Sequence, residues 1–306
     1  MPKTAATARL RQSRADPAFK TFAAAAAVMV LLYAGLGDLI PVWVTYGLLA
    51  LGVVLLGLPH GALDGVLLRN TAFWQQRFPR LRFNLFYLVL AAAVIVAWWL
   101  APVIALAVFL ALSAVHFGGD FKPAARPVQW LAGAWLLLLP IGFHTDEVAW
   151  LFSMLSGPEA EALALALALP VPLLIAVGLG LGLFLSRTRL LLPVEIGLLL
   201  VLAWATPPLV YFAVYFCCLH SLRHFYRSWQ HMPPDWRGPM RQEVVIYTLL
   251  TLVGAGLVGL WLSTGVAADA LLMQLVFIGL AALTVPHMLI LSMAGPPPSE
   301  YERNPS

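Results

Sequence analysis

The chain has 306 residues, of which 61% are hydrophobic and 10% are charged, and its net charge is +4. A soluble domain carries about 25% charged residues, and disordered chains are poor in large apolar side chains. The composition therefore excludes both classes. Long apolar runs predict an all-α, polytopic transmembrane helical bundle, because helices satisfy their own backbone hydrogen bonds within lipid.

The apolar runs supply eight to ten transmembrane spans of roughly 20 residues each. The first run follows five basic residues, as in a signal peptide, but no cleavage site of small residues comes after it, so we predict a retained first span. The alternating segment 161–169 is predicted to be helical, because Ala and Leu are strong helix formers. The ten candidate spans are 21–37, 41–58, 83–100, 102–121, 128–143, 162–185, 190–205, 208–227, 243–263 and 270–292.

The basic residues predict the orientation of the bundle. With ten spans and a cytoplasmic N-terminus, all 18 Lys and Arg residues fall on the cytoplasmic side, either in cytoplasmic segments or at the cytoplasmic end of a span, as the positive-inside rule requires. We therefore predict a multi-pass protein of the plasma (inner) membrane, and the basic surplus does not indicate nucleic acid as a partner. The predicted parts are a basic cytoplasmic tail (1–20), one transmembrane domain (21–292) and a short cytoplasmic tail (293–306).

Five of the seven histidines share one depth in the predicted membrane. They lie on spans that run from outside to inside, about 18–28 Å into a hydrocarbon core of about 30 Å. An ionisable side chain at this depth is costly and marks a functional site, and imidazole commonly binds Fe, Zn, Cu and Ni. A metal site is favoured over hydrogen bonding between helices, the ordinary role of a single such residue. The five are His60, His116, His220, His224 and His287.

The spacing of these histidines suits a metal, and their number and neutral charge suit iron. His220 and His224 are four residues apart, so they share a helix face and can offer two ligands from one helix. Four neutral histidines on an octahedral ion leave two positions for O2 and solvent. Structural zinc would instead be closed by four ligands, which are usually cysteines. The pattern therefore favours Fe(2+) and oxygen activation inside an apolar cavity.

Two aspartates follow two of the histidines at the same spacing. Asp64 lies four residues after His60, and Asp120 lies four residues after His116. A carboxylate beside a ligating histidine can accept its second ring N–H and fix the tautomer. The alternative is an ordinary ion pair with a basic residue at the membrane interface.

Four sequence blocks carry a resemblance to a known family: GLPHGALDG (57–65), SAVHFGGD (113–120), HSLRHF (220–225) and VPHMLI (285–290). In this order and spacing they resemble the Brp/Blh family of integral-membrane β-carotene 15,15′-dioxygenases. The resemblance covers about residues 40–292. It implies a carotenoid-cleaving oxidoreductase that uses O2 to cut β-carotene at its central double bond into two retinal molecules, with a non-haem iron held by histidines.

The resemblance also implies roles for individual residues. His60, His116, His220 and His224 match the family's histidine motifs and are the implied iron ligands. His287 is a candidate fifth ligand, with a place behind the ligands or on the substrate side as the alternatives. Membrane lipid surrounds such an enzyme, and a retinal-accepting rhodopsin is a candidate partner.

The substrate has no polar group, so a carotenoid should enter from the lipid into an apolar tunnel. Aromatic residues near the histidines are candidates for the tunnel wall, although ordinary aromatic packing would produce the same pattern. These candidates are Phe117, Tyr211, Phe212, Tyr215, Phe216 and Phe225.

Three other classes of protein compete with this interpretation. A histidine-box membrane desaturase or hydroxylase would need about eight histidines and an HH pair, which the chain lacks. A haem protein with two axial histidines would show a haem absorption band. A metal or proton transporter would place polar groups across the whole membrane, but here the outer half has almost none, and Glu195, the other deep acid, lies near the inner end of its span.

Overall fold

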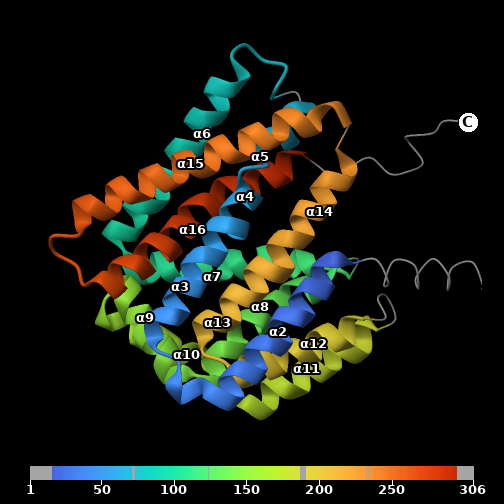
Figure 1. Ribbon diagram of the computed structural model, residues 1–306, viewed down its shortest axis with the longest axis vertical. Coiled ribbons are helices and arrows are strands. Elements are labelled where there is room, and N and C mark those ends of the chain that lie inside the picture. Colours follow the sequence, from blue (N-terminus) through green and yellow to red (C-terminus); the bar gives the residue numbers. More distant parts are fainter. Residues whose placement is uncertain (1–15, 71–72, 123, 187–190, 233, 295–306) are drawn as a thin grey trace, which may run out of the picture.

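The computed structural model describes residues 16–70, 73–122, 124–186, 191–232 and 234–294, and the elements within these ranges are helices without a single strand (Figure 1). This confirms the predicted all-α class. Most of the predicted N-terminal tail and nearly all of the C-terminal tail lie outside the described residues. The helices of the first half are α2 (Pro17–Leu36), α3 (Val42–Gly52), α4 (Leu58–Gly61), α5 (Asp64–Leu67), α6 (Pro79–Leu100), α7 (Pro102–Gly118) and α8 (Arg126–Phe143).

The second half continues in the same way. Short 3-10 turns join several of the helices, and two π-helical segments, η2 (Val53–Gly57) and η6 (Val214–Ser221), interrupt longer helical runs. The helices are α9 (Thr145–Ser156), α10 (Glu161–Leu167), α11 (Val171–Leu185), α12 (Leu192–Ala205), α13 (Pro208–Ala213), α14 (Leu222–His231), α15 (Arg237–Leu262) and α16 (Ala268–Ala294).

Six helical stretches in the described chain are long and apolar enough to cross a membrane, or up to eight if each of two bent pairs is one span. The first pair, α8 and α9, bends by 106°, and the second, α10 and α11, bends by 57°. The predicted span 162–185 is thus two helices, because Pro170 and Pro172 follow α10 and the residue before a proline avoids the helical conformation. The predicted count of eight to ten spans overlaps the observed range of six to eight only at eight.

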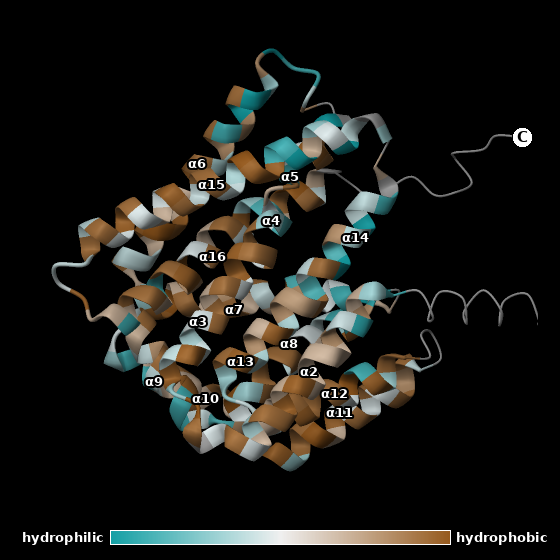
Figure 2. Cartoon of the chain, viewed as in Figure 1, coloured by the Kyte–Doolittle hydropathy of each residue, from teal (hydrophilic) through white to brown (hydrophobic). Residues whose placement is uncertain are grey.

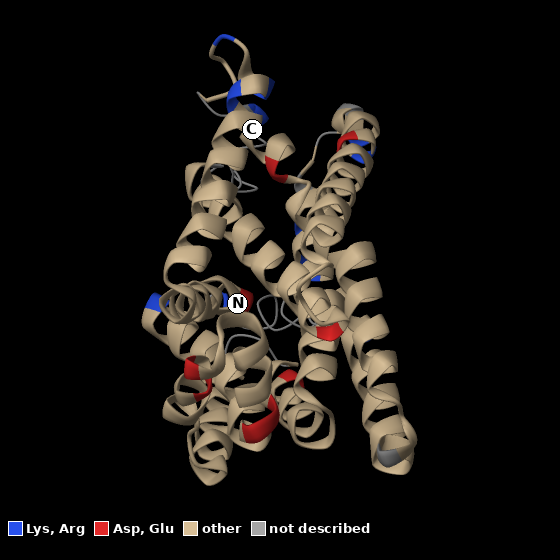
Figure 3. Ribbon diagram, turned by 90° about the vertical axis from the view of Figure 1, so that its left-hand side faces the viewer, with Lys and Arg blue, Asp and Glu red and all other residues tan. Residues whose placement is uncertain are grey.

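Hydrophobic residues predominate along the helices (Figure 2), and many large apolar side chains are exposed on the outside of the bundle, as a lipid-facing surface requires. Trp99 and Trp261 are 82% and 78% exposed. Basic and acidic residues are distributed unevenly: the lower part of the molecule in Figure 3 carries acidic positions but no Lys or Arg. The fold is that of a membrane protein. Its basic and acidic residues are separated, as expected for a protein with a basic and an acidic side.

A close contact between α7 and α8 fixes the helix that carries His116. A side chain at Gly118 would collide with the backbone carbonyl of Gln129, and one at Gly133 would collide with the carbonyl of Ala114. Small residues allow such close approach between membrane helices. The glycine that follows the HF pair in the HFGGD segment is therefore a packing requirement beside the histidine.

The two π-helical segments η2 and η6 pack against each other. A side chain at Gly57 would come within 2.8 Å of the Phe216 ring, and one at Gly52 would come within 3.0 Å of the Cys217 sulfur. His60 follows η2 by three residues, and His220 lies within η6. π-helical turns are rare and are frequent at functional sites, and here both turns meet where the histidines gather.

Candidate metal centre

The five histidines predicted to share one depth come from five different elements and converge on one another. His60 is at the centre, and its ring centroid lies 4.2 Å from that of His224, 4.8 Å from His287, 5.1 Å from His220 and 6.2 Å from His116. The elements are α4 for His60, α7 for His116, η6 for His220, α14 for His224 and α16 for His287. Segments far apart in the sequence therefore supply one cluster.

The ring nitrogens of this cluster are close enough to share a metal ion. Two groups of three histidines each place one ligand atom per residue within 4.8 Å of the others. One group is His60, His224 and His287, the other is His60, His116 and His220. The Nε2 atoms of His116 and His220 are 3.0 Å apart, about the separation of two ligands at right angles on a metal with bonds of about 2.0–2.1 Å.

Asp120 holds the ring of His220. The Nδ1 atom of His220 lies 2.9 Å from Oδ2 of Asp120, and the Tyr215 hydroxyl donates to the same oxygen at 2.9 Å. An ionised carboxylate only accepts hydrogen bonds, so Nδ1 of His220 carries the proton. Its Nε2 lone pair is therefore free to face the cluster, which is the tautomer that metal binding through Nε2 requires.

Asp64 holds the ring of His287 in the same way. Nδ1 of His287 lies 2.6 Å from Oδ1 of Asp64, and the Tyr87 hydroxyl donates to Oδ2 at 3.1 Å. Each aspartate was expected to serve the histidine four residues before it, but in the structure each reaches a histidine on a different helix. The helix after His60 breaks between α4 and α5, so Asp64 does not share a regular helix face with His60.

Three buried ring nitrogens in the cluster have no hydrogen-bond partner in the described part of the chain: Nδ1 of His60, Nε2 of His224 and Nε2 of His287. A buried polar atom without a partner costs free energy, and natural proteins leave few of them. A metal ion would satisfy all three nitrogens at once. The donor set of neutral imidazoles therefore fits a transition metal such as iron.

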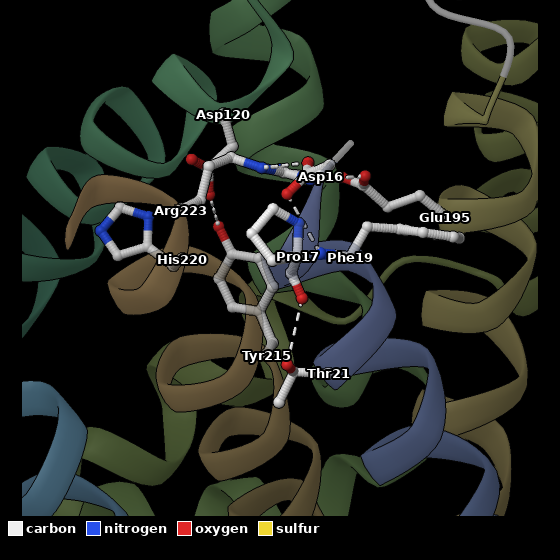
Figure 4. Close-up of polar contacts among 9 residues, drawn as sticks. All are labelled: Asp16, Pro17, Phe19, Thr21, Asp120, Glu195, Tyr215, His220 and Arg223. Carbon is white, nitrogen blue, oxygen red and sulfur yellow. Dashed lines mark hydrogen bonds and ion pairs between the residues drawn. The ribbon is translucent and has the colours of Figure 1, made fainter. Parts of the chain in front are cut away.

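An ion cluster joins Arg223 of α14 to Glu195 of α12 and to Asp16 (Figure 4). Arg223, which is only 2% exposed, donates to both carboxylate oxygens of Glu195 at 3.2 and 2.8 Å and to Asp16 at 3.1 and 3.3 Å. Asp16 also caps α2 by accepting from the backbone N–H of Phe19. The cluster thus ties the segment that carries His220 and His224 to α12 and to the start of α2.

An apolar cavity adjoins the histidines. It contains about 1190 Å³ of space free of atoms, part of it open to the surroundings. Side chains of α7, α8, α9, α13 and α16 line it, and its lining includes His60, His116 and His287. A long hydrocarbon placed in this cavity would meet the histidine cluster in the bundle interior.

The aromatic residues predicted to line a tunnel divide into two sets. Phe117, Phe212 and Phe216 line the cavity, and the rings of Phe212 and Phe216 stack at 5.2 Å. The other three do not line it. The Tyr211 hydroxyl donates to the Leu136 carbonyl at 2.9 Å, Tyr215 binds Asp120, and Phe225 stacks on Trp229.

The sequence analysis did not assign Tyr87, nor the hydrogen-bonding role of Tyr215. A single tyrosine within an apolar span gives no signal of its own, because tyrosines also anchor membrane interfaces. Arg223 and Glu195 did offer a signal, since charged residues inside apolar runs are expected to face partners in the interior.

Comparisons with known proteins agree with this geometry. Residues 51–294 match the family described as beta-carotene 15,15'-dioxygenase, a range that contains all five clustered histidines. The chain is also 36% identical over 253 residues to the beta-carotene 15,15'-dioxygenase of uncultured marine bacterium 66A03, which covers 78% of this chain and 90% of that protein. No solved structure matches. The resemblance seen in the four sequence blocks is confirmed, and the chain belongs to the beta-carotene 15,15'-dioxygenase family.

Proposed function

We propose that this enzyme works on β-carotene through an iron ion held by the clustered histidines. Its family makes it a carotenoid-cleaving dioxygenase, and the reaction is the oxidative cleavage of β-carotene to retinal. One observation carries the site assignment: five buried or partly buried histidines converge, and three of them line an apolar cavity. The proposal adds the metal, its ligands and the position of the substrate to the family's reaction.

The proposed ligands are His60, His116, His220, His224 and His287. The first four match the family's motifs, and the structure supports adding the fifth, because Asp64 orients its ring and its Nε2 is buried without a partner among the described residues. Asp64 and Asp120 are proposed to fix the tautomers of His287 and His220. Iron, when bound, supplies the binding and activation of O2.

The protein's own contribution is orientation and exclusion of water. A hydrocarbon substrate can be held only by shape and apolar contact, and the cavity wall is apolar apart from its three histidines and two hydroxyl side chains. Phe117, Phe212 and Phe216 are proposed to contact the polyene beside the histidines. The depth of the cavity beyond them would determine which double bond lies next to the reactive end.

We also propose how the protein sits in the cell. The charge distribution supports an orientation with both termini in the cytoplasm and the histidine cluster in the cytoplasmic half of the plasma (inner) membrane. Membrane lipid would then deliver β-carotene and receive retinal. A rhodopsin that takes up the retinal stays a prediction from the family resemblance.

The test is expression of the full chain in cells that make β-carotene. We expect the orange colour to fade and retinal to accumulate, and we expect the purified protein to carry iron by elemental analysis. Removing the metal with a chelator should stop retinal formation, and Fe(2+) should restore it where Zn(2+) does not. Persistent pigment with a folded, iron-loaded protein would refute the proposed reaction, and activity that survives complete iron removal would refute the metal.

A further inference from the structure

Two hydroxyl groups stand out in the cavity wall. Apart from the three histidines, the only polar side chains among the described residues that line it are Ser113 and Thr284. Ser113 lies three residues before His116 on α7, and Thr284 lies three residues before His287 on α16. Residues three apart share a helix face, so each hydroxyl lies one turn from a histidine of the cluster.

The two hydroxyls differ in what they bind. The Thr284 hydroxyl donates to the backbone carbonyl of Leu280 at 2.7 Å, a common local bond for a threonine within a helix. Ser113 is only 3% exposed and has no hydrogen bond within the described part of the chain. A hydroxyl withheld from bulk water without a partner costs free energy, and this one lines a cavity whose wall is otherwise apolar apart from Thr284 and the three histidines. Its position therefore points to a ligand that brings an oxygen acceptor.

The reaction creates that acceptor. β-Carotene is a hydrocarbon and offers Ser113 no hydrogen bond. In the cleavage, the central carbon–carbon double bond breaks and each of its two carbons gains one oxygen atom of O2, so that two aldehydes form without release of a proton. An acceptor oxygen thus appears only as the reaction proceeds, in the cavity that Ser113 lines one helical turn from His116.

We propose that the Ser113 hydroxyl donates a hydrogen bond to the aldehyde oxygen of retinal as it forms in the cavity. This inference rests on the proposed function. An interaction made with the product and not with the substrate lowers the barrier of a step whose transition state already carries part of the new carbon–oxygen bond. Thr284, whose proton is already donated to Leu280, does not supply this bond and is the matched control.

The test measures retinal bound to the full-chain protein in detergent without O2, by the carbonyl stretching frequency in Raman spectra and by quenching of tryptophan fluorescence. In the wild type we expect a carbonyl frequency below that of retinal in a hydrocarbon solvent. Ser113→Ala should lose this shift and bind retinal about 2–10-fold more weakly, the equivalent of one hydrogen bond. Ser113→Thr, which keeps the hydroxyl, and Thr284→Val should keep both properties, and all four proteins should bind β-carotene equally well.

Two results would overturn the assignment of Ser113. One is a Ser113→Ala variant whose carbonyl frequency and retinal affinity equal those of the wild type. The other is an equal loss of retinal and β-carotene binding, which would mean that Ser113 only maintains the shape of the cavity. Retinal formation by the wild type in carotene-producing cells checks the proposed function separately, because that function fails if no retinal forms there, whatever the spectra of the variants.

Discussion

Two regions around the cluster orient a histidine ring in the same way but differ in their surroundings. In both, a histidine is followed four residues later by an aspartate, and that aspartate reaches a histidine on another helix while a tyrosine hydroxyl holds the carboxylate. The first region joins Asp64, His287 and Tyr87, and the second joins Asp120, His220 and Tyr215. We call them the Asp64 unit and the Asp120 unit.

The units differ in how firmly the carboxylate is held. In the Asp120 unit both donors bind the same oxygen, Tyr215 is fully buried, and Figure 4 places the ion cluster of Arg223 beside it. In the Asp64 unit the donors bind different oxygens, and the Tyr87 hydroxyl also lies 3.1 Å from the carbonyl of Leu283. Each aspartate uses a single tyrosine partner, so the two units differ in the surroundings of the carboxylate. This difference predicts that the Asp120 unit tolerates change less well.

The largest expected effect comes from the residue common to both groups of ligand atoms. His60→Ala removes one ligand from each group, so we expect the protein to lose iron and to form no retinal. Iron content after purification and retinal formation in carotene-producing cells measure this. His144→Ala is the control, because His144 binds the carbonyl of Ala203 outside the cluster. A His60→Ala protein that keeps its iron would show that the cluster is not the metal site.

A smaller effect is expected from the two aspartates. Asp120→Asn presents an amide where His220 and Tyr215 need an acceptor, so we expect iron affinity to fall about 10–100-fold, the usual cost of losing a partner of a ligating histidine. Asp64→Asn should lie toward the lower end of this range, because its oxygens each accept one donor. Titration of the metal-free variants with Fe(2+) gives the affinities.

The control for the aspartates is Asp146→Asn, an exposed carboxylate far from the cluster in the sequence, which should bind iron like the wild type. If Asp64→Asn weakens iron binding more than Asp120→Asn does, the ion cluster and the shared oxygen do not make the second unit firmer. If neither variant weakens binding, His220 and His287 need no carboxylate to orient them.

The sequence predicted that the five histidines lie at one level, and they do gather in one cluster, but their lateral pairing could not be predicted. Hydropathy and charge place each residue along the membrane normal, and this was enough to bring five histidines to one level. The Asp64–His287 and Asp120–His220 pairs join residues 223 and 100 positions apart, and such pairing depends on which helices are neighbours. Nothing in composition or spacing specifies these neighbours.

Local irregularities explain the remaining differences. A π-helical turn holds more residues than the 3.6 of an α-helix, so η6 shifts the direction of the residues around it. Phe212 and Phe216, which are four residues apart, line the cavity, whereas their neighbours Tyr211 and Tyr215 point to other partners. Apolar composition gives no sign of such a turn. The break at Pro170, in contrast, falls at a proline, which the sequence itself displays.

The smallest expected effect separates the two tyrosines. Tyr215→Phe removes one hydrogen bond from a fully buried carboxylate oxygen, so we expect a loss near the upper end of the usual 0.5–1.5 kcal/mol, that is, about tenfold in iron affinity. Tyr87→Phe should cost less, because the carboxylate of Asp64 keeps its bond to His287 on the other oxygen. Iron titration and the temperature of unfolding measure both variants.

A double-mutant cycle shows whether each tyrosine acts through its aspartate. If it does, Tyr215→Phe should add almost nothing to the loss already caused by Asp120→Asn, because the partner of the hydroxyl has gone, and the two single effects should fail to add. The cross pair, Tyr215→Phe with Asp64→Asn, joins the two units and should be additive if they are independent. Coupling across the units as strong as coupling within them would mean that the cluster responds as a single body, and that the distinction between the Asp64 unit and the Asp120 unit has no energetic content.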